Sequence, residues 1–282
     1  MIKISNYSLN YSRLLAQGQM TVLQFLDLCR ELGVEGASLH VRDLPELSTA
    51  YLRQVRRAYL DRGLSMSMFT VSTDFGNPRE GARREFEKAL EAIRAAAFLG
   101  APILRIFAGS PKGEADRAAA FARAVEGARK VCEEAAEAGL PVGLQNHNHG
   151  ALCRTGEECL RFMREVNHPN LVFLLDTGQF AGSRGASGSP PPELRGADYL
   201  ESIRMTAPLA RHVRVKFYNP TPEGAEPWID YDKIFDILRS VHYGGFIDIV
   251  YEPGSRQGDP GEDVRSAIPR VVRFLRRKVL MV

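Results

Sequence analysis

Five consecutive polar side chains, including two histidines that could transfer protons, lie at the end of one apolar segment, in the stretch PVGLQNHNHG at 141–150. Gln145, Asn146, His147, Asn148 and His149 follow one another there, and Gly150 closes the run. An apolar segment that leads into such a run is typical of a buried strand opening into a loop, where α/β proteins often keep their chemistry. A solvated turn without any chemical role is the alternative, and this stretch alone does not separate the two.

Ionisable residues also line or end the other apolar segments. Side chains alternate between the two faces of a strand, so residues two apart share a face. The ionisable residues are His40, Arg105, His147, Asp176, His212 with Arg214 and Lys216, and Asp248 with Glu252, and Gln145 shares a face with His147. Ordinary roles compete with chemistry at several of them. Asp176 and Glu252 could be turn carboxylates, and Arg105 could be a buried ion-pair partner of either one.

Strand-like and helix-like segments alternate along the chain about eight times. The strands are predicted at 2–9, 36–41, 64–71, 102–108, 141–145, 170–176, 212–217 and 245–251, and the helices at 21–32, 48–62, 77–100, 114–138, 155–166, 198–209, 231–241 and 263–278. This pattern favours an α/β fold in which residues 1–282 form a single (β/α)8 TIM barrel. Active sites of such barrels lie at the carboxyl ends of the strands, where the polar residues fall.

The segment 181–196 is rich in glycine and serine and contains three consecutive prolines. It is too interrupted for a helix or strand, and we expect a loop that covers the barrel mouth as a lid.

Composition and motifs exclude several classes of protein. A net charge of +3 with dispersed basic residues argues against nucleic acid as a partner. No glycine-rich phosphate-binding motif opens a helix, so no nucleotide cofactor is expected. The four cysteines lack metal-site spacing, and no apolar run is long enough to cross a membrane. We therefore expect a cytoplasmic protein with a small-molecule substrate, and its oligomeric state stays open.

The chain resembles the xylose isomerase-like TIM barrel superfamily, which includes sugar phosphate isomerases and epimerases. The resemblance covers most of the chain and rests on LGVEGASLHV, NPREGARREFEKALEAIRAAAFLGAPILRIFAG, GLQNHNHG, FLLDTGQF, HVRVKFYN and WIDYDKIFDILRSVHYGGFIDIVYEPG. It implies a divalent metal held by Glu, Asp, His and Glu on the fifth to eighth strands. The same glutamates move a proton beside a carbonyl while the metal steadies the enediolate.

Only one of those four ligand positions is kept in this sequence. Asp176 matches, whereas Gln145, Arg214 and Val250 stand where the family has Glu, His and Glu. A histidine that often follows the aspartate by three residues is Gln179 here.

Two models of the site follow. In one, a divalent metal (Mn, Mg or Zn) binds a rearranged set of Asp176, Glu252, His147 and His212. In the other, no metal binds; Arg214 and Lys216 stabilise the oxyanion, and Glu252 or His147 is the base.

The resemblance implies an isomerase or epimerase that abstracts a proton next to the carbonyl of a small polyhydroxylated substrate. His147, Glu252, Lys216 and Arg214 are the candidate catalytic residues. The candidate substrate-binding residues are Gln145, His40, Arg105, His212 and Gln179. Two alternatives remain: a lyase or dehydratase that works by β-elimination, and a sugar-binding barrel without turnover. DNA repair of the endonuclease IV type would need many more metal ligands than this chain offers.

Overall fold

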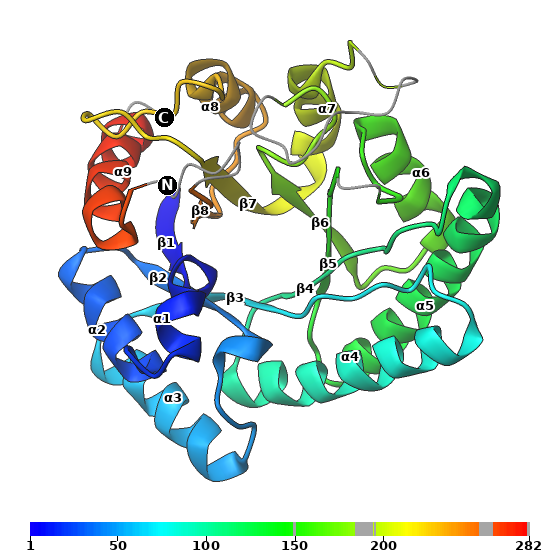
Figure 1. Cartoon of the computed structure of the whole chain (residues 1–282), viewed down its shortest axis with the longest axis horizontal. Helices are drawn as coiled ribbons and strands as arrows, with labels where there is room; N and C mark the ends of the chain where they lie inside the picture. The colour runs from blue at the N-terminus through cyan, green and yellow to red at the C-terminus, as the bar shows by residue number, and fades with distance from the viewer. Residues whose placement is uncertain (149–150, 184–193, 195, 254–261, 281–282) are drawn as a thin grey trace.

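The computed structural model describes residues 1–148, 151–183, 194, 196–253 and 262–280. Eight parallel strands form a closed barrel in sequence order, with β1 pairing with both β2 and β8, so the expected (β/α)8 barrel is confirmed. Figure 1 shows helices surrounding the strands. The strands are β1 (Lys3–Tyr7), β2 (Gly36–His40), β3 (Ser65–Thr70), β4 (Leu104–Ile106), β5 (Val142–Gln145), β6 (Leu171–Asp176), β7 (Ala210–Phe217) and β8 (Phe246–Tyr251).

The longer helices bury an apolar stripe against the barrel. In α6, Cys159, Phe162 and Val166 are buried, and Thr155 caps the helix by accepting a hydrogen bond from the Glu158 amide. The described helices are α1 (Ser12–Ala16), α2 (Val22–Glu31), α3 (Thr49–Asp61), α4 (Arg79–Leu99), α5 (Arg117–Glu137), α6 (Gly156–Val166), α7 (Tyr199–Thr206), α8 (Tyr231–Ser240) and α9 (Val264–Val279). None of them is long and apolar enough to cross a bilayer.

Some strands end earlier than the sequence predicts, because side-chain hydroxyl groups take the place of backbone groups as hydrogen-bond partners at their ends. The predicted strand 102–108 is regular only over Leu104–Ile106. Beyond it, the Thr73 hydroxyl accepts from the Phe107 amide and donates to the Phe107 carbonyl. The predicted strand 2–9 stops at Tyr7, where Ser8 turns and its hydroxyl accepts from the His40 amide.

Three further boundaries differ from their predicted positions. Strand β7 begins at Ala210, two residues before its predicted start. The helix predicted at 198–209 is regular over Tyr199–Thr206 and then tightens into a 3-10 turn at Ala207–Leu209. Pro208 lacks the amide that would continue the helix. The helix predicted at 114–138 likewise begins as a 3-10 turn at Glu114–Asp116.

The apolar core lies mainly between the strands and the surrounding helices. A separate small cluster of Met68, Ile103 and Leu174, with Val172 against it, lies apart from that main core. Buried polar residues include Gln145, Asp176, Arg214 and Lys216, which lie at or near the carboxyl ends of their strands. The fold therefore concentrates its buried charge at the end where barrels carry their active sites.

Candidate active site

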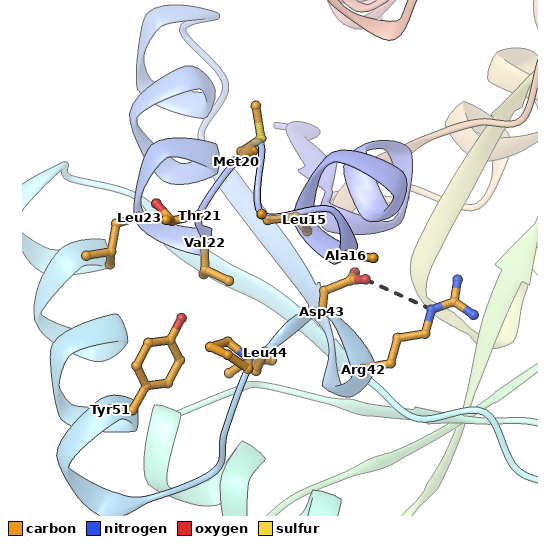
Figure 2. A pocket seen from close by; sticks show the side chains of 12 residues that line it. Leu15, Ala16, Met20, Thr21, Val22, Leu23, Arg42, Asp43, Leu44 and Tyr51 are labelled. Carbon is orange, nitrogen blue, oxygen red and sulfur yellow. Dashed lines mark ion pairs between the residues drawn. The ribbon is translucent and has the colours of Figure 1, made fainter.

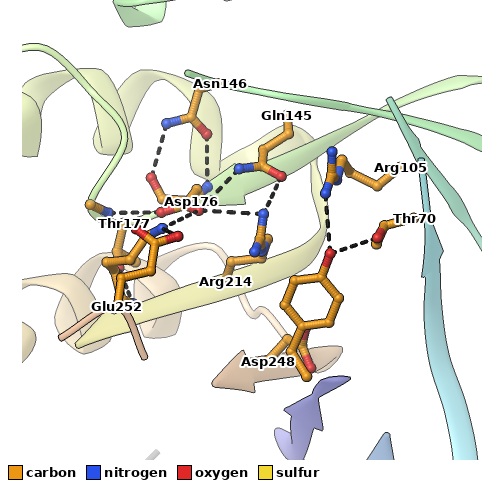
Figure 3. Close-up of polar contacts among 12 residues, drawn as sticks. Thr70, Arg105, Gln145, Asn146, Asp176, Thr177, Arg214, Asp248 and Glu252 are labelled. Atoms are coloured by element: carbon orange, nitrogen blue, oxygen red, sulfur yellow. Dashed lines mark hydrogen bonds and ion pairs between the residues drawn. The ribbon is translucent and has the colours of Figure 1, made fainter. Parts of the chain in front are cut away.

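Asp176, the last residue of β6, is fully buried and held by hydrogen bonds from several sides. Its Oδ2 accepts from Gln145 Nε2 at 3.0 Å, and its Oδ1 accepts from the Gly178 amide at 3.0 Å. The side chain of Asn146 accepts from the Asp176 amide at 2.7 Å and donates to the Asp176 carbonyl at 2.9 Å. These bonds fix the position of the carboxylate (Figure 3).

Arg214 of β7 brings a positive charge beside this carboxylate. Its Nη1 lies 3.7 Å from Asp176 Oδ2 and donates a hydrogen bond to Gln145 Oε1. The amide of Gln145 therefore donates to Asp176 and accepts from Arg214, which defines its orientation. On its other side, the guanidinium of Arg214 lies over the ring of Tyr7, 4.8 Å from the centroid.

Lys216, two residues further along the same face of β7, links two carboxylates. Its Nζ lies 2.9 Å from Glu252 Oε1 and 3.8 Å from Asp176 Oδ2. The side chain of Lys216 is 2% exposed, whereas that of Glu252 is 35% exposed. Glu252 is thus the more solvent-accessible of these two carboxylates, and it contacts a buried ammonium group.

The backbone of Gly178 packs directly against Lys216. A Cβ at Gly178 would lie 2.6 Å from Lys216 Cγ and 2.9 Å from the Tyr218 hydroxyl. Such distances are too short for real contacts, so a side chain here would displace the lysine or the tyrosine. Glycine at this position allows the lysine to lie between Asp176 and Glu252.

Arg105 of β4 is buried beside this network, with 2% of its surface exposed. Its Nη1 donates to the Val71 carbonyl at 3.1 Å, its Nη2 donates to the Tyr7 hydroxyl at 3.2 Å, and its guanidinium stacks on Phe107. It does not form the ion pair with Asp176 or Glu252 that the sequence left open, because β4 directs it toward Tyr7 on β1. Burial lowers the pKa of Arg105 to about 10, so it stays charged at neutral pH.

Asp248 and His212 form a buried polar layer deeper along β8 and β7. The Asp248 carboxylate accepts hydrogen bonds from Ser5 Oγ at 2.5 Å and Ser38 Oγ at 2.7 Å, and burial raises its pKa to about 6. His212 Nε2 lies 4.0 Å from Asp248 Oδ2, beyond hydrogen-bond distance, and burial lowers the pKa of His212 to about 3. His212 is therefore neutral at physiological pH.

The remaining predicted site residues lie around the network. His40 Nδ1 accepts from the Arg42 amide, which places the ring proton on Nε2, 3.0 Å from Ser72 Oγ. Burial, followed by the charge of Arg105, lowers the pKa of His40 to about 2. His147 follows β5, and its ring packs edge-on against Phe107.

Gln179 is buried, and its Oε1 has no hydrogen-bond partner among the described residues.

Of the predicted site residues, the structure joins five through direct contacts: Gln145, Asp176, Arg214, Lys216 and Glu252. The predicted lid at 181–196 lies mostly outside the described residues, which omit 184–193 and 195.

Two residues of the site have no role in the sequence prediction. Tyr7 bonds Arg105 and Thr70 through its hydroxyl and lies beneath Arg214 with its ring. Its alternation with Ser5 on one face of the first strand is a signal that could have identified it. Asn146 lies within the polar run that the sequence shows. Its two hydrogen bonds to the backbone of Asp176 arise because β6 pairs with β5, which the sequence of the run does not reveal.

The family to which the sequence is similar implies a divalent metal, and the donor set does not fit one. No group of three or more His, Cys, Asp or Glu side chains within the described ranges could hold a metal ion. Asp176 already accepts hydrogen bonds at both oxygens and has Arg214 and Lys216 within 4 Å. Two fixed positive charges at this distance repel a dication, and neither side chain is a ligand while protonated.

A concave region lies between the end of α1, the start of α2, α3 and the turn after β2 (Figure 2). It has a volume of about 460 Å³ and a mostly apolar lining that includes Met20, Leu44 and Tyr51. Its charged pair, Arg42 and Asp43, lies 4.0 Å apart. This pocket lacks the buried acid–base network of the barrel mouth, so the mouth is the candidate active site.

The closed parallel barrel with charged groups at its carboxyl end defines a (β/α)8 barrel protein with a polar site in its mouth. Residues 26–278 match the family model described as xylose isomerase-like TIM barrel, and the chain belongs to this family. No curated protein matches the chain in sequence.

Solved structures with the same fold share little sequence with this chain. An L-ribulose 3-epimerase superposes with a TM-score of 0.77 at 17% identity, covering 100% of this chain and 95% of its own. D-psicose 3-epimerase from Clostridium cellulolyticum H10 has a TM-score of 0.74 at 15% identity, covering 99% of both chains. A probable 3-DHS dehydratase from Bacillus anthracis has a TM-score of 0.72 at 19% identity, covering 98% of this chain and 99% of its own. At these identities the similarity shows a common fold.

Proposed function

We propose that this protein is an enzyme that removes a proton from the carbon next to the carbonyl of a small polyhydroxylated substrate. Isomerisation or epimerisation follows when the proton returns to a different carbon or face. The observation that carries the proposal is the contact of Lys216 with Glu252 and Asp176. A partly exposed carboxylate beside buried cations provides both a base and a stabiliser of negative charge.

Glu252 is the proposed base, and it accepts the proton from the substrate carbon. The electron pair of the broken C–H bond moves toward the carbonyl, so negative charge develops on the carbonyl oxygen. Lys216 and Arg214 stabilise this oxygen, because preorganised charges act strongly at a buried site. Protonated Glu252 then returns the proton to the neighbouring carbon, which completes an isomerisation. In an epimerisation, a second acid supplies a proton to the opposite face of the original carbon while Glu252 keeps the first one. His147 remains a second candidate base, and Gln145 a candidate ligand of a substrate hydroxyl.

This scheme places two protein cations where a dication would otherwise supply the positive charge. The support is the pair of distances from Asp176 to Arg214 and Lys216, 3.7 and 3.8 Å. Gln145 and Val250 stand where the family resemblance implies glutamates that bind the metal. Arg214 and Lys216 would supply positive charge to the site in the absence of that metal. The candidate substrate-binding residues also include His40, Arg105, His212 and Gln179. The competing arrangement is a site in which Asp176, Glu252 and His147 hold a divalent metal.

Hydrogen exchange in D2O tests the proposal. Keto-sugars and polyhydroxylated keto acids are incubated with protein that has been treated with EDTA, and deuterium at the carbon next to the carbonyl is followed by NMR. We expect exchange without added metal, and a loss of about 10²- to 10⁴-fold in Glu252→Gln.

Three other outcomes are informative. Exchange that needs Mn²⁺ or Mg²⁺ supports the competing metal arrangement. Loss of water from the substrate, seen as a new double bond, identifies a β-eliminating lyase. Binding of a substrate without any exchange would show a sugar-binding barrel and contradict the proposal.

A further inference from the structure

Arg105 is a buried cation without an anionic partner. Within the described part of the chain, no carboxylate lies within 4.0 Å of its guanidinium, and its hydrogen bonds go to the neutral oxygens of Val71 and Tyr7. Arg154 provides a contrast, because it is buried to a similar degree but pairs with Glu158 at 2.7 Å. A buried charge is normally paired, so the absence of a partner at Arg105 requires an explanation.

The guanidinium also has unused donors. An arginine carries five N–H groups, and the Nε of Arg105 has no hydrogen-bond partner among the described residues. Its two Nη atoms make one hydrogen bond each, to Val71 and Tyr7. At least three N–H groups therefore remain for a ligand.

The groups around Arg105 make this corner of the site attractive to an anion. The positive charge of Arg214 contributes, after burial, to the lowered pKa of Arg105. His40 is neutral, and its Nε2 proton is directed at Ser72 Oγ, so the ring adds no negative charge to this corner. Tyr7 fixes the position of Arg105 through its hydroxyl and that of Arg214 through its ring.

We propose that Arg105 binds a carboxylate of the substrate, so that the substrates are sugar acids rather than neutral sugars. This inference rests on the proposed function and names its substrate class. A carboxylate takes two parallel N–H bonds from a guanidinium and matches its single positive charge. A phosphate would bring a second negative charge toward Asp176, whose charge acts on Arg105, and this favours the carboxylate.

Binding of matched probes tests the inference independently of catalysis. D-gluconate is compared with D-glucitol, and D-galactonate with galactitol, by calorimetry at constant ionic strength. At least one acid should bind about ten-fold or more tightly than its alcohol, the range of a charge-assisted hydrogen bond. In Arg105→Met this advantage should disappear, so that each acid and its alcohol bind equally tightly.

Thermal unfolding separates this role from a structural one. Arg105→Met removes an unpaired buried charge, which is favourable, but it also removes the hydrogen bonds to Val71 and Tyr7, so its melting temperature should stay close to that of the wild type. The control Arg154→Met removes a paired arginine and leaves Glu158 with fewer donors, so its melting temperature should fall. A fall at Arg105→Met as large as at Arg154→Met would assign Arg105 to stability alone.

The remaining outcomes distinguish this inference from the proposed function. The carboxylate site is refuted if neither acid binds better than its alcohol, or if Arg105→Met keeps the advantage of the acid. It is also refuted if D-glucitol 6-phosphate binds through Arg105 more tightly than D-gluconate does. Exchange with neutral keto-sugars would then still support the proposed function. If the acids bind through Arg105 but no keto acid exchanges its proton, the binding site stands and the proposed function fails.

Discussion

The guanidinium of Arg214 lies 3.7 Å from the carboxylate of Asp176, at the strand position where the family resemblance implies a metal-binding histidine. Gln145, at another altered ligand position, bridges the two by donating to Asp176 and accepting from Arg214. Gln145 and Arg214 thus form one connected network with Asp176, in which a cation of the protein lies beside the only ligand position that the sequence keeps. A change at one of these residues should therefore alter what the others can bind.

Gln145→Glu alone should not create a metal site. The new carboxylate would lie against Arg214 and form an ion pair with it. The double variant Gln145→Glu with Arg214→His adds two ligands to Asp176 and removes one of the two repelling charges. We expect Mn²⁺ to bind the double variant at least ten-fold more tightly than the single variant, measured by calorimetry.

The matched control for this experiment adds Asp176→Asn to the double variant, which should abolish the gained affinity. Tight stoichiometric Mn²⁺ binding by the wild type would contradict the prediction and favour the metal arrangement.

Lys216→Met should slow proton exchange by about 10²- to 10³-fold, the effect of removing a preorganised charge at a buried oxyanion. Methionine fills a similar volume, so the fold is retained. The decrease should appear in kcat rather than in KM, because the charge acts mainly on the developing oxyanion. An unchanged kcat with a raised KM would show that Lys216 only binds substrate.

Gly178→Ala should disturb the site through Lys216. Its Cβ would lie 2.7 Å from Lys216 Cβ and 2.9 Å from the Tyr218 hydroxyl, so one of them must move. We expect about a ten-fold loss of exchange and a destabilisation of about 1–3 kcal/mol, typical of overpacking.

Gly33→Ala is the control for this variant. Gly33 has a φ of +69°, and no atom lies within 4 Å of the position that an alanine Cβ would take, so alanine adds backbone strain without a contact. Its exchange rate should stay at the wild-type value while its melting temperature falls. An equal loss of exchange in both variants would indicate a general loss of folded protein.

His212→Gln should make the protein less sensitive to acid. Burial lowers the pKa of His212 to about 3, below the unfolded value of about 6.5. Below pH 6.5 the unfolded chain takes up a proton that the folded chain does not, so this residue's stabilisation is lost as the pH falls toward 3. The loss is about 1.4 kcal/mol per pH unit.

Chemical denaturation at pH 6.5 and pH 4 measures this effect. The unfolding free energy of the wild type should decrease by about 3 kcal/mol more than that of the variant over this range. Asp248 acts in the opposite direction, because its raised pKa of about 6 favours the folded state as it becomes protonated. Asp248→Asn should therefore increase the acid sensitivity, and equal pH profiles in all three proteins would contradict both assignments.

The amino-acid sequence by itself determined the barrel and the end of the barrel where its polar residues gather. Alternation of apolar segments with amphipathic helices is a local property, and it survives errors of a few residues at element ends. Two of those errors arose where a side-chain hydroxyl, rather than a backbone group, bonds the backbone of a strand end. The Thr73 hydroxyl bonds Phe107 in this way, and the Ser8 hydroxyl bonds the His40 amide. Local patterns contain no information about such long-range bonds.

The tertiary structure alone decided which polar residues contact one another. Asp176 joins Gln145 and Lys216 because neighbouring strands bring residues 31 and 40 positions apart to one level of the barrel. Arg105 faces Tyr7 instead of a carboxylate, although the two are 98 residues apart. Side-chain direction across a closed barrel depends on strand register and tilt, which the spacing of residues within one strand does not specify.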